Sequence, residues 1–139
     1  PMVWEPSNQN GAFTAGRPWL PVASEHLALS VAAQEDDPAA LLHHYRRAIT
    51  FRQANPALSV GAHDKVAATG DVVYFTRAHD GVQIFCAFNI SDTPSDLDLP
   101  KGAWIPIGDD LGAAHVSADG WMHLGPWQVC LLTKLADKV

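Results

Sequence analysis

Residues 72–90 read VVYFTRAHDGVQIFCAFNI, and this stretch decides the fold. Apolar residues recur at every second position on both sides of Asp80-Gly81. An Asp-Gly pair between two such runs is typical of a β-hairpin, because both residues tolerate a positive φ. The pattern predicts strands at 72–77 and 82–90. In the second strand Phe85 and Ala87 lie on one face, and the other face is apolar throughout (Val82, Ile84, Cys86, Phe88, Ile90). We therefore expect this strand to be central in its sheet.

Shorter strand signals follow the hairpin. Leu97 and Leu99 alternate with aspartates, which is typical of a half-exposed edge strand. Residues 104–107 form a second edge strand, because Pro106 cannot donate a ladder hydrogen bond inside a sheet. A run at 127–135 closes the series, and we expect Trp121 and Trp127 to pack inside the domain. Several short strands separated by turns predict an antiparallel β-sandwich.

One long helix precedes the strands, at residues 38–54. Asp37 is a suitable N-cap, and Pro38 suits the first helical position, where no backbone donor is needed. The helix must end before Pro56, which forces its predecessor out of the α region. Apolar side chains recur at intervals of three and four residues and therefore form one stripe along the helix (Leu41, Leu42, Tyr45, Ala48, Ile49 and the stem of Arg52).

Residues 1–35 show no sustained period of either kind. Irregular connections of this length are uncommon in compact domains and are usually functional loops or linkers. Trp4, Phe13 and Trp19 argue against a solvated linker, since linkers rarely carry large apolar side chains. We expect an ordered loop that covers another structure, and, since the first residue is Pro1, a chain that is part of a larger protein.

Composition excludes several classes of function. Hydrophobic residues make up 47% of the 139 residues and charged residues 17%, which excludes a disordered chain. The net charge of −6 disfavours nucleic acid as a partner. No apolar run approaches the ~18 residues that span a bilayer, so no membrane partner is expected. Cys86 and Cys130 lie in apolar strand-like runs and are expected to be buried thiols, the alternative being one disulfide between adjacent strands.

We find no pattern typical of a catalytic, metal or cofactor site. His43 and His44 are adjacent on the helix, about 100° apart, and cannot share a metal ion. The other five histidines stand singly in loops or at strand ends and are expected to be solvated (His26, His63, His79, His115, His123). The paired acids Asp109-Asp110 and Asp96-x-Asp98 could serve glycoside hydrolysis or bind calcium, but solvated turns are favoured.

The five tryptophans leave two alternatives open. An indole face packs well on the apolar face of a pyranose, so Trp4, Trp19 or Trp104 could form a sugar-stacking platform. Packing within the core or against a neighbour is the favoured interpretation.

Four short segments carry a family resemblance: PMVWE at 1–5, NGAFT at 10–14, PWLPV at 18–22 and FRQANPAL at 51–58. Together they resemble the C-terminal part of α-glucosidases, the oligo-1,6-glucosidase-like enzymes of glycoside hydrolase family 13 in the α-amylase superfamily. The resemblance covers about the first 60 residues, and the remainder matches only as a β-sandwich. Val3, Glu5 and the order Gly11-Ala12 depart from the family pattern and bear on substrate preference.

The resemblance implies a mainly β chain with one long helix. Residues 1–57 would be the last loop and helix of a (β/α)8 barrel, and residues 58–139 a C-terminal β-sandwich. The catalytic carboxylates of such retaining hydrolases lie on earlier barrel strands, so no catalytic residue is expected here and the chain alone should be inert.

The expected partners are the upstream catalytic barrel and small α-glucosides or oligosaccharides. Residues that would line the outer sugar subsites are Trp4, Glu5, Asn10 and Phe13. No cofactor or metal is implied, and a cytoplasmic location is favoured. The alternative is a free-standing carbohydrate-binding or protein-interaction β-sandwich module.

Overall fold

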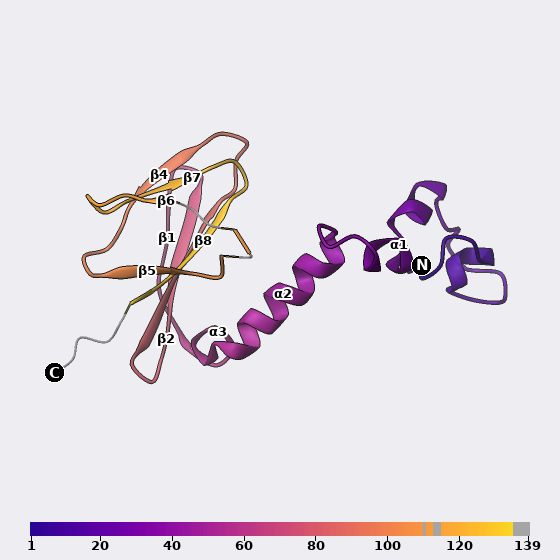
Figure 1. Ribbon diagram of the computed structural model, residues 1–139, viewed down its shortest axis with the longest axis horizontal. Coiled ribbons are helices and arrows are strands. Elements are labelled where there is room, and N and C mark those ends of the chain that lie inside the picture. The colour runs from indigo at the N-terminus through magenta and orange to yellow at the C-terminus, as the bar shows by residue number, and fades with distance from the viewer. Residues whose placement is uncertain (110, 113–114, 135–139) are drawn as a thin grey trace. The chain divides into compact units, whose positions relative to one another are not determined.

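The computed structural model describes residues 1–109, 111–112 and 115–134 (Figure 1). The chain forms two compact units, residues 1–48 and 49–139, which are described separately. The first unit contains the 3-10 turns η1 (Gln9–Ala12) and η2 (Ser24–Leu29), helix α1 (Val31–Glu35) and the beginning of helix α2 (Leu41–Ala54). None of the helices in the described ranges has the length and apolarity needed to cross a bilayer.

The second unit begins with the end of α2 and helix α3 (Pro56–Ser59) and is otherwise β-structure. Its strands are β1 (Ala62–Thr69), β2 (Val72–His79), β3 (Val82–Asn89), β4 (Ser95–Asp98), β5 (Trp104–Ile107), β6 (His115–Val116), β7 (Trp121–Leu124) and β8 (Val129–Lys134). They form a five-stranded sheet in the order β1-β2-β3-β8-β5 and a three-stranded sheet in the order β4-β7-β6. Every neighbouring pair is antiparallel (Figure 1).

The predicted hairpin and its central strand are confirmed. Strands β2 and β3 pair from Val72↔Asn89 to His79↔Val82, so that only Asp80 and Gly81 form the turn. Their φ values are 47° and 80°, the left-handed region that this two-residue connection requires. Strand β3 lies between β2 and β8 and is buried on both faces.

The main hydrophobic core contains side chains from both sheets. It is composed of Val72, Phe85, Ala87, Leu97, Met122, Leu124, Cys130 and Leu132. A smaller cluster on the other face of β3 joins Ile84 and Cys86 to Ala57 of α3. Neither Cys86 nor Cys130 forms a disulfide, and burial raises the pKa of the Cys86 thiol to about 12, so this thiol stays protonated at neutral pH. The expectation of buried thiols is confirmed.

Several local predictions about the strands are wrong. Trp121 is 42% exposed and Trp127 is 69% exposed, so neither packs inside the domain. The apolar pattern predicted that the last strand begins at Trp127, but β8 begins at Val129. Trp127 has φ +55°, which is not a strand conformation. Ile90 lies beyond β3 and is exposed. Residue 135, expected on the last strand, lies outside the described residues.

The edge strands are confirmed where the sequence carried a local signal. Strand β5 with Pro106 forms one edge of the large sheet, and β4 forms one edge of the small sheet. Strands β1, β6 and β7 were not predicted. Strand β1 has no buried residue, and β6 has only two residues, so neither presents the alternating apolar pattern by which strands are recognised.

Helix α2 begins three residues later than predicted, at Leu41. Asp37 does cap, but it caps a separate turn: its Oδ1 accepts from the Ala39 N–H at 2.9 Å. The side chain of Gln34, which the sequence did not suggest, accepts from the Leu42 N–H at 3.1 Å at the start of α2. The helix ends at Ala54, as Pro56 requires.

Candidate functional site

The opening segment turns on three consecutive left-handed residues. Asn10, Gly11 and Ala12 have φ values of 54°, 63° and 58°. Gly11 is buried, and a Cβ built on it would lie 2.8 Å from Cγ1 of Val3. A side chain at this position would be strained by both the backbone and the contact. The turn therefore requires glycine at position 11.

Hydrogen bonds to this turn and to α1 fix the backbone of Trp4 and Glu5. The Gly11 carbonyl accepts from the N–H groups of Trp4 at 2.8 Å and Glu5 at 3.3 Å. The Trp4 carbonyl accepts in turn from the Ala32 N–H at 3.0 Å, in the first turn of α1. The fully buried Ser30 caps that helix. Hydrogen bonds thus fix the backbone of two of the four predicted subsite residues, Trp4 and Glu5.

Asn10 supports the loop that carries Phe13. Its Nδ2 donates to the Gly16 carbonyl at 2.9 Å and to the Thr14 carbonyl at 3.4 Å. The Asn10 carbonyl accepts from the Phe13 N–H at 3.2 Å. The side-chain amide is therefore engaged with the backbone of its own loop, a structural task that the sequence did not suggest.

The other three predicted side chains are available to a ligand. Trp4 is 49% exposed, Phe13 is 51% exposed, and Glu5 is exposed. Half-exposed aromatic rings on an ordered backbone offer large apolar faces at small conformational cost.

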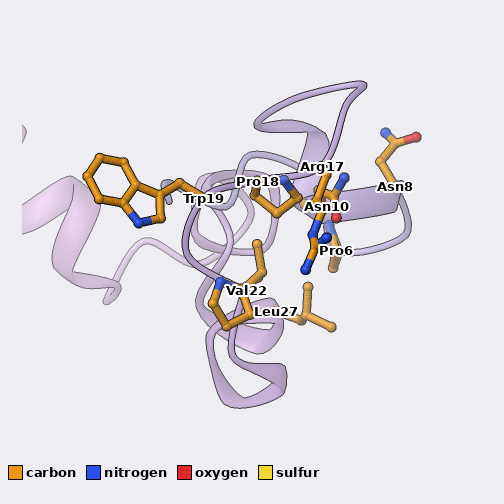
Figure 2. A pocket seen from close by; sticks show the side chains of 10 residues that line it. Pro6, Asn8, Asn10, Arg17, Pro18, Trp19, Val22 and Leu27 are labelled. Carbon is orange, nitrogen blue, oxygen red and sulfur yellow. The ribbon is translucent and has the colours of Figure 1, made fainter.

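An open pocket of about 540 Å³ lies beside the turn (Figure 2). It is lined by Pro6, Asn8, Asn10, Gly11, Arg17, Pro18, Trp19, Pro21, Val22 and Leu27. Figure 2 shows Asn8, Asn10 and Arg17 grouped on one side, with the Trp19 indole apart from them on the other. A pocket that combines apolar walls with a few amide and guanidinium donors is typical of a binding site for a polar organic ligand.

Of the four predicted residues, only Asn10 lines this pocket. The sequence alone did not indicate Asn8, Arg17 or Val22 as site residues. A sequence signal for this pocket is the motif PWLPV at 18–22, which supplies part of its lining. Trp19, in the same segment, is 97% exposed, an unusual state for a tryptophan.

Helix α1 is tied to the start of α2 by an ion pair. Arg46 donates from both Nη atoms to the Glu35 carboxylate, at 2.6 and 2.8 Å. The hydrogen bond from Arg46 lowers the pKa of Glu35, and the same bond raises the pKa of Arg46. Both groups are solvated, so the pair orients the two helices more than it stabilises them.

The described carboxylates do not form a catalytic arrangement. Asp96 contacts His123 on the exposed side of its strand. The Ser117 hydroxyl lowers the pKa of Asp119, the direction opposite to the one a general acid needs. Asp110, of the predicted pair Asp109-Asp110, lies outside the described residues. Within the described ranges, no group of three or more His, Cys, Asp or Glu side chains converges as a closed metal site would require.

A protein-family model matches the first part of the chain. The model described as the alpha amylase catalytic domain matches residues 1–61, which contain the opening segment and helices α1, α2 and α3.

Individual proteins match over more of the chain. A probable alpha-glucosidase of Rhizobium meliloti is 47% identical over 107 residues, 77% of this chain and 19% of that protein. An oligo-1,6-glucosidase of Parageobacillus thermoglucosidasius is 31% identical over 101 residues, 72% of this chain and 18% of that protein. The crystal structure of XgtA, an alpha-glucosyl transfer enzyme, matches 97% of this chain and 25% of its own, with a TM-score of 0.87 and 32% identity. The chain spans about a fifth of the length of these curated relatives.

Proposed function

Because this chain belongs to the α-amylase family of glycoside hydrolases, we propose that it is the C-terminal part of an α-glucosidase-type enzyme. The intact enzyme hydrolyses terminal α-linked glucose in small α-glucosides or oligosaccharides. The observation that carries the proposal is the 47% identity to a probable alpha-glucosidase across 77% of the chain. The match of residues 1–61 to the catalytic-domain model supports it independently.

In this proposal residues 1–57 are the last loop and helix of the catalytic (β/α)8 barrel. The side chains of α2 support this role. Leu41 is 64% exposed, Tyr45 is 61% exposed and Ile49 is 53% exposed, and a spacing of four residues places the three on one helix face. An apolar row of this kind is costly in water and is explained by a neighbour that covers it. Residues 58–139 form the stabilising C-terminal sandwich.

The reaction proceeds with retention and uses carboxylates upstream of this chain. A retaining glycosidase needs a nucleophile and a general acid about 5–5.5 Å apart on barrel strand ends. The lowered pKa of Glu35 and of Asp119 keeps both carboxyls ionised at neutral pH, which suits neither for the acid's role. The chain supplies the rim of the active site and is inert by itself.

A segment exchange tests the proposal. We replace the matching segment of the Rhizobium meliloti relative by this chain and assay glucose release from maltose, isomaltose and p-nitrophenyl α-glucoside. The expected result is hydrolysis by the chimera, with α-glucose as the first anomer seen by NMR, and none by the chain alone. Leu41→Asp in the chimera should abolish folding or activity, because it charges the covered row. Thr50→Asp, at an exposed position of the same helix, is the matched control. A chimera that melts like the relative but releases no glucose contradicts the proposal.

Within this function, Trp4, Glu5 and Phe13 contact the outer sugar units, and Asn10 holds their loop. We expect Trp4→Ala and Phe13→Ala in the chimera to lower kcat/KM for trisaccharides about tenfold, or about 1.4 kcal/mol, relative to p-nitrophenyl α-glucoside. Glu5→Gln should shift the ratio of α-1,4 to α-1,6 cleavage. Asn10→Ala should affect all substrates alike, because it loosens the loop itself. Ser7→Ala, at an exposed position outside the pocket lining, is the control. The assignment is removed if Trp4→Ala and Phe13→Ala leave the preference for trisaccharides over p-nitrophenyl α-glucoside unchanged and Glu5→Gln leaves the linkage preference unchanged.

The exposed Trp19 indole favours a second candidate, a carbohydrate-binding module that acts without the barrel. Trp104 does not support it, since its indole N–H donates to the Pro100 carbonyl at 2.7 Å and its ring packs on Phe85. Titration of the chain with maltose and isomaltose separates the two functions. A saturable change in tryptophan fluorescence that Trp19→Ala abolishes supports the module, and a flat titration to millimolar sugar excludes it.

A further inference from the structure

The outer face of the three-stranded sheet places two histidines and an aspartate in one row. Strand register sets His123 of β7 directly opposite His115 of β6 on one side and Asp96 of β4 on the other. The neighbouring Leu97 and Met122 are buried in the core, so these three side chains occupy the opposite, solvated face. The expectation that His115 and His123 stand singly is wrong for this pair.

Asp96 determines which nitrogen of His123 can bind a ligand. The Nδ1 of His123 lies 2.7 Å from Oδ1 of Asp96, and since a carboxylate only accepts, Nδ1–H donates. The imidazole is thereby held with Nε2 as the lone-pair nitrogen. A carboxylate behind a histidine in this way orients metal-binding imidazoles and raises their basicity.

The second imidazole lies at a distance that suits a shared ion. The ring centres of His115 and His123 are 5.7 Å apart and the rings are inclined by 30°. Two imidazoles bound to one tetrahedral ion, with bonds of about 2.0–2.1 Å, have their centres roughly 5–5.5 Å apart, so a small movement of these exposed side chains brings both rings onto one ion. Asp98, also at an exposed position of β4, and Asp119, in the turn between β6 and β7, add negative charge near this face.

We propose that His115 and His123 form a surface site for a divalent transition-metal ion that prefers imidazole, such as Zn²⁺, Cu²⁺ or Ni²⁺. Asp96 is the positioning residue, and water completes the coordination shell. With two protein ligands the site is open and binds far more weakly than a closed four-ligand site. It excludes Mg²⁺ and Ca²⁺, which require oxygen ligands. The proposal is independent of the glycosidase function.

The test is a Zn²⁺ titration of the full chain at pH 7.5. Binding is measured by calorimetry and by ¹⁵N NMR of the histidine side chains. We expect one saturable site and shifts confined to the signals of His115 and His123. His115→Gln and His123→Gln should each weaken binding tenfold or more. Asp96→Asn should weaken it about tenfold, and should change the tautomer signature of His123 before metal is added, which a loss of packing alone does not do. Magnesium should cause no shift.

His79→Gln is the matched control. His79 also lies beside a carboxylate, with Nε2 3.4 Å from Asp80, but no aromatic contact joins it to another described imidazole. Its loss should leave the affinity for Zn²⁺ unchanged. Circular dichroism confirms that each variant is folded. Zinc affinity that survives both His115→Gln and His123→Gln, or the absence of a saturable event, overturns the proposal.

Discussion

Phe85→Ala should cost the sandwich about 3–5 kcal/mol of its free energy of unfolding, the usual loss for a buried phenylalanine. Phe85 is 1% exposed and belongs to the main core. Its ring packs against Tyr74 and Trp104, with centres 5.7 Å apart in both cases. Since the total stability of such a domain is about 5–15 kcal/mol, this single truncation removes a large share of it. We expect the melting temperature to fall by more than about 10 °C, measured by circular dichroism of the full chain.

Trp127→Ala is the matched control for this loss. It removes a larger aromatic ring from the same unit, but Trp127 is 69% exposed. Surface truncations of this kind usually change stability by about 0.5 kcal/mol or less. Equal losses for the two variants would mean that the cluster around Phe85 is not the core that holds the sheets together.

The parts of the fold that the sequence predicted are those with a local cause. Asp80-Gly81 forms a turn because of its own backbone preferences, and Pro56 ends α2 because of its own ring. Pro106 confines its strand to an edge for the same reason. Strand β1 was not predicted because its exposed side chains show no alternating apolar pattern. Its position is determined by its pairing with β2.

The same distinction applies to the candidate sites. The candidate residues Trp4, Glu5, Asn10 and Phe13 belong to two short sequence motifs, and they lie in one hydrogen-bonded segment. Two other contacts could not be predicted from the local sequence. Gln34 caps the N–H of Leu42, eight residues further along the chain, and the strand register places His115 opposite His123. Contacts of this kind depend on how the chain folds back on itself, which no window of a few residues contains.

Gly61→Ala should also be severely destabilising, for a steric reason. Gly61 connects α3 to β1, and a Cβ built there would overlap the Ala57 carbonyl oxygen and would lie 2.8 Å from that of Ala78. Both are backbone atoms: Ala57 belongs to α3, and Ala78 pairs with the first residue of β1. Relief therefore requires α3 to open or the β1–β2 register to shift. We expect a loss of about 3 kcal/mol or more, the upper end of the cost of overpacking.

Gly70→Ala separates this clash from backbone strain. Gly70 has φ +55° and no heavy atom within 4 Å of a built Cβ, so its substitution costs only the left-handed backbone, about 1–2 kcal/mol. Gly61→Ala should exceed it and should also increase hydrogen exchange at the paired amides of β1 and β2, because the clash lies at the end of their ladder. The Arg77 guanidinium, which donates to the Gly61 carbonyl at 2.7 Å, would lose that partner in the shifted state. If Gly61→Ala costs no more than Gly70→Ala, the packing of α3 against the first strand is looser than these distances require.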